Sequence, residues 1–215
     1  DFDIRACWSM PIRTAGGKAI GSFALSCFEH RQPGVFHRKL LEIGAYLIGI
    51  VLARQASQAR IAYLASHDAL TGLPNRTLVR DRLEQAIARA QRERRGCALL
   101  FLGVDNFKLV NDTLGHVLGD ALLAQVAVRL GACLQQADSL GRQGGDEFLA
   151  VLAETCERDA ISAAAERFLD AMQAPFRIDG HLVSASLSLG GAAFPADGAD
   201  PDTLIRKAGA ALLHA

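Results

Sequence analysis

The stretch SLGRQGGDEFLAVL, residues 139–152, places two adjacent glycines between two strand-like runs. Glycine takes positive φ angles without steric cost, so Gly144 and Gly145 predict the tight tip of a β-hairpin. Two carboxylates, Asp146 and Glu147, follow the glycines directly. Carboxylates next to glycine backbone could bind a cation together with an anionic ligand. The alternative is that this segment is an ordinary solvent-exposed turn. The residues of the tip alone leave both readings open.

The sequence on both sides of this hairpin alternates between helical and strand-like patterns. Apolar periodicity predicts helices over residues 77–94, 107–113, 118–135 and 157–173, and a last helix from about Pro201. The apolar run CALLFLGV predicts a buried strand, and FRIDGHLVSASLSLGGAAF predicts paired strands with Asp-Gly as a turn. The pattern therefore predicts an α/β (α+β) domain with a mixed sheet flanked by helices.

Residues 1–67 are organised differently. Two strand-like runs, IRACWSMPIR and AIGSFALSCF, flank the turn residues TAGGK, and a proline-free helical pattern extends from about His37 to His67. Within it, the apolar run IGAYLIGIVLA, residues 43–53, is too short to span a bilayer. We therefore read this run as a buried helix and expect no membrane span. The polar second half favours a solvent-bridging connector or a helix that pairs with its twin.

The composition argues against several classes of protein. The 23 basic and 23 acidic residues balance, so bulk charge does not hold the chain to nucleic acid, and we expect no nucleic-acid partner. The five cysteines are scattered without a C-x-x-C pair, which argues against a disulfide framework or a zinc site. No N-terminal segment has the pattern of a signal peptide. We expect a cytoplasmic protein or a cytoplasmic part of a larger one.

Three motifs occur in an order that resembles one family. They are DALTGLPNR (68–76), DNFKLVNDTLGHVLGD (105–120) and GGDEF (144–148), and together they are similar to the GGDEF family of diguanylate cyclase domains. The resemblance implies a nucleotidyl-cyclase, palm-like fold and the joining of two GTP molecules into the bacterial second messenger cyclic di-GMP, usually by a dimer. ACWSMPIR, GSFALS and the helix after them resemble the C-terminal part of a GAF sensor domain with its exit helix.

These resemblances divide the chain into three parts. Residues 1–55 would be the end of a GAF-like domain with its exit helix, residues 56–67 a connector helix, and residues 68–215 a GGDEF domain. We expect the GAF-like domain to begin before Asp1 and the GGDEF domain to continue beyond Ala215. We also expect a homodimer formed through the connector helix. Degenerate members of the family often precede an EAL phosphodiesterase domain, so an EAL domain is the partner expected downstream.

The resemblance also implies functional roles for individual residues of this chain. Asp146 corresponds to a ligand of the Mg²⁺ (or Mn²⁺) bound to GTP, and the carbonyl of Val104 to a second ligand from the protein. Glu147 corresponds to a candidate base for the attacking 3′-hydroxyl. Arg142 corresponds to a residue near the phosphates or the subunit interface, and a solvated base is its plain alternative. The implied nucleotide-binding residues are Asn106, Phe107, Lys108, Asn111, Asp120, Gly144 and Gly145.

The chemistry of these residue types fits their implied roles. Backbone N–H groups at a helix start near residues 106–108 can face phosphate oxygens. Asn111 and Asp120 would read guanine, because a carboxylate can accept hydrogen bonds from N1–H and N2–H₂ of the base, and an amide can donate to its acceptor edge. Helix capping is the plain alternative for Asn111 and Asp120.

The chain departs from the family pattern at three places. The pattern D-x-D-x-F-K reads GVDNFK here, so Gly103 replaces the first, metal-binding acid. Loss of a residue that only supports a metal ligand lowers metal affinity or activity roughly 10–100-fold, and loss of a ligand itself should lower them at least as much. Near the C-terminus, Gly209 and Leu213 replace an acid and a tyrosine. Gln135 replaces the arginine of an R-x-x-D product-inhibition motif and removes its bidentate grip, so product inhibition is not expected.

The leading hypothesis from the sequence is a degenerate GGDEF domain that binds GTP at a weakened magnesium site and relays a signal. Two alternatives stay open. One is an active diguanylate cyclase in which water or Asp105 fills the gap at Gly103. The other is a dimerisation and signalling module that binds no nucleotide.

Overall fold

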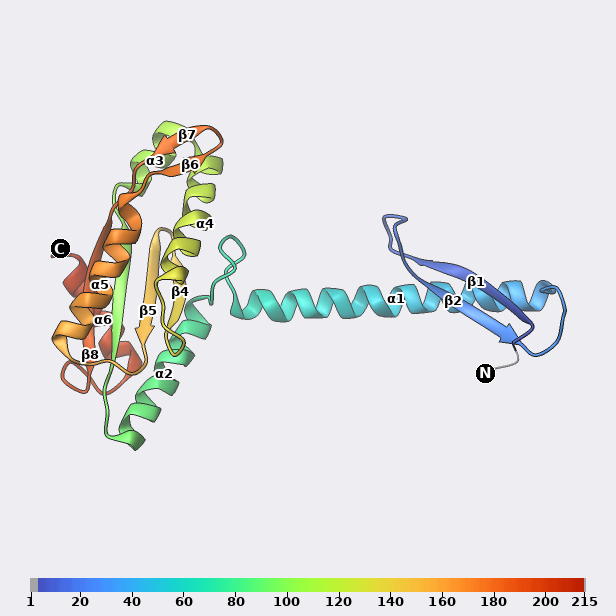
Figure 1. Cartoon of the computed structure of the whole chain (residues 1–215), viewed down its shortest axis with the longest axis horizontal. Coiled ribbons are helices and arrows are strands. Elements are labelled where there is room, and N and C mark those ends of the chain that lie inside the picture. Colours follow the sequence, from blue (N-terminus) through green and yellow to red (C-terminus); the bar gives the residue numbers. More distant parts are fainter. Residues whose placement is uncertain (1–3, 215) are drawn as a thin grey trace. The chain divides into compact units, whose positions relative to one another are not determined.

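A computed structural model describes residues 4–214 of the chain, which separates into two compact units, Asp1–Tyr63 and Leu64–Ala215. In the first unit, strand β1 (Ala6–Arg13) pairs antiparallel with β2 (Ala19–Cys27). The helix α1 (Val35–Ser66) follows them, as Figure 1 shows. The predicted hairpin and long helix are confirmed, and the helix bounds lie within two residues of those expected.

Only one side of α1 packs against the hairpin. Leu41, Ala45 and Gly49 are its buried residues, and a Cβ on Gly44 would overlap the ring of Phe23. The other apolar residues of the run 43–53 are largely exposed. The expectation that this run forms a buried helix is therefore wrong, because two strands cover a single helix face. No helix in residues 4–214 has the length and apolar character needed to cross a membrane.

The second unit alternates helices and strands in the predicted order. Its helices are α2 (Arg76–Glu93), α3 (Phe107–Leu114), α4 (His116–Ala132), α5 (Arg158–Gln173) and α6 (Pro201–Leu212), and its strands are β3 (Cys97–Val104), β4 (Ser139–Gly144), β5 (Glu147–Leu152), β6 (Phe176–Ile178), β7 (His181–Val183) and β8 (Leu187–Phe194). The run CALLFLGV forms β3 with the predicted bounds. Asp179 and Gly180 both take positive φ between β6 and β7, as a tight hairpin turn requires.

The main sheet has the strand order β4-β5-β3-β8, and each of its pairings is antiparallel. The α+β class is confirmed, whereas the sheet is antiparallel and not mixed. The reason lies in the two crossovers. The connection from β3 to β4 through α3 and α4 joins strands that run in the same direction, but β5 lies between them. The connection from β5 to β8 likewise leaves β3 between its two strands.

Helices cover both faces of this sheet. Because side chains of a strand alternate between faces, Leu100 and Leu102 of β3 pack with α4 and α5, and Leu99 and Phe101 pack with α2 and α6. Gly190 permits the closest of these contacts, since a Cβ there would overlap the backbone of α6. Two apolar layers therefore fix the sheet, and the ends of β3 and β5 are held in place from both sides.

Arg129 on α4 joins the two helices of one face. Its guanidinium donates hydrogen bonds to the carbonyls of Ala171 (3.2 Å), Ala174 and Pro175 (2.9 Å) at the end of α5. Its Cζ lies 3.6 Å from the centre of the Phe176 ring. The last carbonyls of a helix have no partner within that helix, so a charged donor from a neighbouring helix satisfies them.

Replacing this guanidinium should destabilise the domain. We expect Arg129→Met to lower the free energy of unfolding by about 2 kcal/mol, because several carbonyls lose a charged donor and Phe176 loses its cation–π contact. Urea denaturation measures the change. Arg206→Met, at an exposed position of α6, is the matched control and should stay within about 0.5 kcal/mol of the unmodified chain. Equal effects of the two substitutions would show that Arg129 does not hold the helices together.

Candidate functional site

The tip of the β4–β5 hairpin meets the end of β3. Gly103 lies opposite Glu147 on β5 and opposite Ser188 on β8. The Val104 N–H donates to the carbonyl of Asp146 over 3.1 Å, which ties the tip to the strand end. Gly145 has φ 53°, a value that favours glycine over residues with a side chain. The predicted hairpin tip is thus confirmed, and Val104, Asp146 and Glu147 are brought to one end of the sheet.

Arg142 supports this tip from within the domain. Its Nε and Nη2 donate to the carbonyl of Gly145 (3.0 and 2.6 Å), and its Nη1 donates to the Asp68 carboxylate (3.0 Å). Asp68 also accepts from the N–H and the hydroxyl of Thr71 (2.8 and 2.7 Å). The first motif, DALTGLPNR, therefore braces the GGDEF tip. The sequence pointed to this motif without revealing its structural role, and an additional role of Arg142 near phosphates stays a prediction.

Asp68 and Glu147 have pKa values shifted in opposite directions. Burial alone would raise the pKa of Asp68, but the hydrogen bonds from Thr71 and Arg142 and the charge of Arg142 outweigh burial and hold its pKa below the usual value. The pKa of Glu147 is raised, first by partial burial and then by the neighbouring charge of Asp146. A carboxylate with a raised pKa is a better proton acceptor, which is what a general base needs.

Helix α3 begins two residues beyond Asp105. Asn106 occupies the N-cap with φ 55°, and its side chain makes no capping hydrogen bond. The first N–H groups of α3, from Phe107 and Lys108, have no acceptor within the helix. A helix start with free N–H groups is an anion-binding arrangement, so this geometry is compatible with the implied phosphate contact.

Asn111 of α3 lies against α4 beside Asp120. A Cβ on Gly119 would overlap the Asn111 amide oxygen, so this glycine permits the close approach of the two helices. The amide oxygen is buried and has no hydrogen-bond partner within residues 4–214. Leaving such a group unpaired costs about 1–3 kcal/mol. Asn111 therefore has an unpaired, buried amide oxygen at the contact between α3 and α4, and Asp120, which follows Gly119 in the sequence, is exposed.

The position of Gly103 has room for a Cβ atom. A Cβ there would meet only Leu212, at 3.5 and 3.9 Å from its two methyl carbons, which are ordinary contacts. Nothing in the packing therefore requires glycine. Steric crowding therefore does not explain why a glycine stands here in place of an acid.

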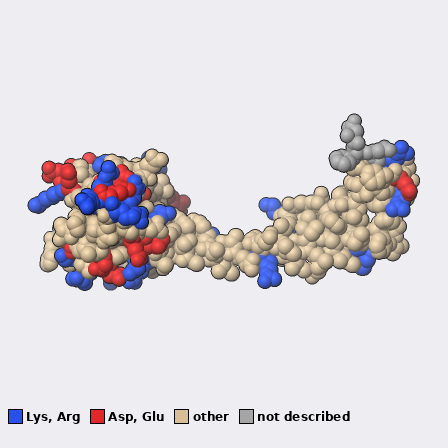
Figure 2. All heavy atoms as spheres, turned by 90° about the horizontal axis from the view of Figure 1, so that it is seen from below, with Lys and Arg blue, Asp and Glu red and all other residues tan. Residues whose placement is uncertain are grey.

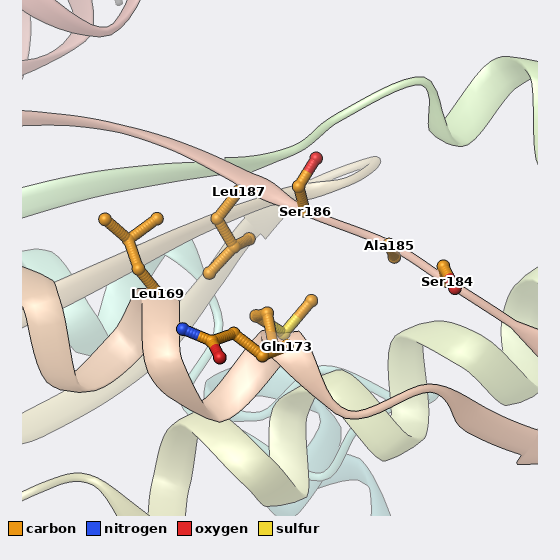
Figure 3. A pocket seen from close by; sticks show the side chains of 7 residues that line it. Leu169, Gln173, Ser184, Ala185, Ser186 and Leu187 are labelled. Carbon is orange, nitrogen blue, oxygen red and sulfur yellow. The ribbon is translucent and has the colours of Figure 1, made fainter.

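The Asp105 carboxylate is hydrogen-bonded to two serines. Its carboxylate accepts from the hydroxyls of Ser186 (2.6 Å) and Ser188 (2.7 Å), and its N–H donates to the Ser186 carbonyl (3.0 Å). Figure 3 shows the Ser186 side chain directed away from α5. Asp105 therefore joins the end of β3 to the segment that leads into β8. The sequence analysis did not identify these serines, because they lie outside the three motifs and far from Asp105 in the sequence.

A pocket of about 280 Å³ lies along the same segment, between it and α5. It is lined by Leu169, Met172, Gln173, Ser184, Ala185, Ser186 and Leu187, most of them seen in Figure 3. This pocket contains none of the predicted site residues and no ionisable side chain. The candidate site is therefore the open surface at the end of β3 and not this pocket.

The oxygen atoms that could hold a metal are the Asp146 carboxylate and the Val104 carbonyl. In the described part of the chain, no three His, Cys, Asp or Glu side chains gather to hold a metal ion. Mg²⁺ is usually bound through one or two carboxylates together with substrate phosphates, and not by an all-protein cage. These donors consequently fit an ion that arrives with a nucleoside triphosphate.

The lowered pKa of Asp68 predicts how the brace responds to acid. A carboxyl whose pKa is lower in the folded state adds stability above its unfolded pKa and loses it as the pH falls through the folded value. We expect Asp68→Asn to be less stable than the unmodified chain at pH 7, with the difference shrinking below about pH 4. Urea denaturation at several pH values measures this, with exposed Asp159→Asn as control. A difference that stays constant down to pH 3 would contradict the brace.

Comparison with known proteins places these motifs in context. The family model described as "Diguanylate cyclase, GGDEF domain" matches residues 65–215. The bifunctional diguanylate cyclase/cyclic di-GMP phosphodiesterase MucR of Pseudomonas aeruginosa is 43% identical over 175 residues, covering 81% of this chain and 25% of that protein. The cyclic di-GMP phosphodiesterase PdeR of Escherichia coli is 40% identical over 165 residues, covering 77% and 24%. This chain spans about a quarter of the length of each.

Solved structures agree with the fold. The GGDEF domain of TpbB from Pseudomonas aeruginosa matches with a TM-score of 0.67 and 39% identity, over 69% of this chain and 87% of that one. A sensory box/GGDEF family protein from Caulobacter crescentus matches with a TM-score of 0.66 and 37% identity, over 70% and 97%. The three linked motifs, the antiparallel sheet that brings them together and these likenesses show that the chain belongs to the GGDEF family of cyclic di-GMP signalling domains.

Proposed function

We propose that the chain is a degenerate GGDEF domain, which binds GTP and relays a signal but makes little or no cyclic di-GMP. The observation that carries the proposal is Gly103, because a glycine stands where the family pattern has a metal-binding acid, opposite Glu147 of the tip. Asp105 is the nearest carboxylate along the chain. Its engagement by Ser186 and Ser188 supports the view that it does not replace the missing ligand.

The remaining residues would hold GTP in the following way. The N–H groups at residues 106–108 bind the phosphates. The Asp120 carboxylate accepts hydrogen bonds from N1–H and N2–H₂ of guanine, and the Asn111 amide donates to the acceptor edge of the base. The Asp146 carboxylate and the Val104 carbonyl would hold one magnesium ion, which when bound would neutralise phosphate charge. The open backbone at Gly144 and Gly145 lets the nucleotide approach the tip. Glu147 keeps a proton-accepting role, but the first acidic ligand of a two-ion site is missing.

The rest of the proposal concerns the signal. Residues 1–55 would be the end of a GAF-like sensor domain, and residues 56–67 would form the helix that connects it to the GGDEF domain in a homodimer. A downstream EAL phosphodiesterase domain would receive the signal. The names of MucR and PdeR, which include phosphodiesterase activity, support this pairing. Product inhibition is not expected, since Gln135 replaces an arginine and Asp138 accepts hydrogen bonds from the N–H groups of Gln135 and Ala153.

An active diguanylate cyclase is the second candidate. The tip carboxylates favour it, because Asp146 and Glu147 are both present and the raised pKa of Glu147 suits a base. In that case water would complete the coordination at Gly103. A module that binds no nucleotide is the third candidate, and the presence of Asn111 and Asp120 argues against it.

Restoring the acid should restore chemistry. With GTP and Mg²⁺ or Mn²⁺, we expect the unmodified chain to form little cyclic di-GMP and Gly103→Asp to form at least about 10-fold more, since a metal ligand returns to a position where a Cβ would make only ordinary contacts. Chromatography of the products measures the rate. Adding Asp146→Ala to Gly103→Asp is the control and should remove the gain. Turnover by the unmodified chain comparable to Gly103→Asp would contradict the degenerate reading.

Base recognition should survive the loss of the acid. We expect GTP to bind more tightly than ATP, and Asp120→Ala to weaken GTP binding by about 10- to 100-fold, because a charged hydrogen-bond acceptor for guanine is lost. Calorimetry with each nucleotide measures both affinities, and Asp159→Ala on the exposed face of α5 is the control. Equal affinity for GTP and ATP would instead favour the nucleotide-free module.

A further inference from the structure

Strand β8 forms one edge of the main sheet (Figure 1). Because the Asp105 N–H donates to the Ser186 carbonyl, the antiparallel register directs the backbone groups of every second residue from Ser186 onward to β3. The residues between them, Leu187, Leu189 and Gly191, direct their N–H and C=O groups outward. Within residues 4–214 these outward groups have no hydrogen-bond partner. A row of free donors and acceptors therefore lines this edge.

The open part of this edge has two defined ends. Beyond Gly191, the Ala193 N–H donates to the Asp197 carboxylate (2.8 Å), and the Ala193 carbonyl accepts from the Asp197 N–H (2.7 Å), which closes the edge. At the other end, the pocket of about 280 Å³ lies between α5 and the segment 184–187. The accessible backbone thus extends from this pocket to Gly191, which is itself exposed.

The two edges of the sheet differ in their protection. On β4, the Arg142 N–H donates to the Pro74 carbonyl (2.9 Å), and α2 packs against the strand. The sequence of β8, LSLGGAAF, contains no charged residue and no proline, which are the residues that commonly keep edge strands from pairing. Figure 2 shows acidic and basic side chains on the visible face of the unit Leu64–Ala215, so their absence from β8 is a local feature. The edge of β8 is therefore open to pairing with another strand.

The pocket indicates what kind of strand would pair here. Figure 3 shows Leu169 and Gln173 of α5 beside the extended segment that leads into Leu187. Leu187 packs on the α5 side of the sheet, and residues directly opposite each other in paired strands share a face. A residue paired with Leu187 would therefore direct its side chain into the pocket. Since no ionisable side chain lines the pocket, this side chain should be large and apolar.

A second copy of β8 fits this pocket poorly. In a two-fold antiparallel pair centred on Leu189, Gly191 of one copy would lie opposite Leu187 of the other. Glycine offers the pocket no side chain, and the backbone of Ala193, the next outward residue, is already bonded to Asp197. A different chain with a large apolar residue at this position would satisfy both the backbone and the pocket.

We propose that the edge of β8 and the pocket beside it form a docking groove for an extended, uncharged peptide segment of a partner protein, which adds to the sheet as a further strand. The backbone of the segment pairs with Leu187, Leu189 and Gly191, and one large apolar side chain fills the pocket. Main-chain hydrogen bonds supply affinity in such complexes, and the side-chain pocket supplies specificity. Neither contact requires a bound nucleotide.

Amide hydrogen exchange of the full 215-residue chain, followed by nuclear magnetic resonance, tests whether the edge is open. We expect the outward amides of Leu189 and Gly191 to exchange at least about 10-fold faster than the inward amides of Ser188 and Gly190, because only the inward amides are bonded to β3. Equal protection of all four amides would show that the edge is already covered and would overturn the groove.

A display library of random short peptides is the probe for the occupant. Selection against the full chain should enrich uncharged sequences with one large apolar residue among β-branched residues. The most enriched peptide, measured by fluorescence anisotropy, should bind Gly191→Pro at least about 10-fold more weakly than Gly191→Ala. Both substitutions add a Cβ at the same place, but only proline removes the outward N–H, and an edge strand tolerates proline where its N–H faces solvent.

A second pair of variants tests the pocket. Leu169→Lys brings a charge to the pocket and should weaken binding of the same peptide at least about 10-fold, whereas Leu182→Lys, at an exposed position outside the pocket, should not. Circular dichroism shows that each variant remains folded. A library that enriches no peptide would overturn the groove, and equal binding to the two Gly191 variants would overturn strand addition. A dimer that Gly191→Pro dissociates and Gly191→Ala does not would assign the edge to a second copy and overturn the peptide partner.

Discussion

The antiparallel pairing of β3 with β5 is the constraint on which the rest of the GGDEF domain depends. It sets Gly103 opposite Glu147 and lets the Val104 N–H reach the carbonyl of Asp146. A shift of one residue would turn the apolar side chains of β3 to the wrong layers of the core, so packing on both faces enforces this register. The position of the tip carboxylates therefore follows from the burial of the strands behind them.

Two hydrogen-bonded braces secure the ends that the core does not reach. Arg142 connects Asp68 to the Gly145 carbonyl on the hairpin side, and Asp105 connects β3 to Ser186 and Ser188 on the other. In each brace a carboxylate accepts hydrogen bonds from protein donors, which take the place of water molecules at a partly exposed edge of the sheet. Gly103 belongs to neither brace, so neither of them depends on the residue type at that position.

The sequence predicted individual strands and turns well because neighbouring residues determine them. The uninterrupted apolar run of β3, the Asp-Gly turn after β6 and the glycines of the tip each carry their own signal. What it could not predict depends on distant partners. The antiparallel order of the sheet follows from which strand lies between two others, and the exposure of α1 residues 43–53 follows from the size of the hairpin. The pairing of Asp105 with serines 81 and 83 positions away leaves no local trace.

The central claim is that this domain retains a nucleotide site with half of its metal ligation. The number of metal ions bound with the nucleotide tests it most directly. Electron paramagnetic resonance counts bound Mn²⁺ in the presence of a GTP analogue that cannot react at its α-phosphate. The degenerate site should hold one Mn²⁺ per chain, and Gly103→Asp should hold two. Two ions bound with similar affinity by the unmodified chain would contradict the claim.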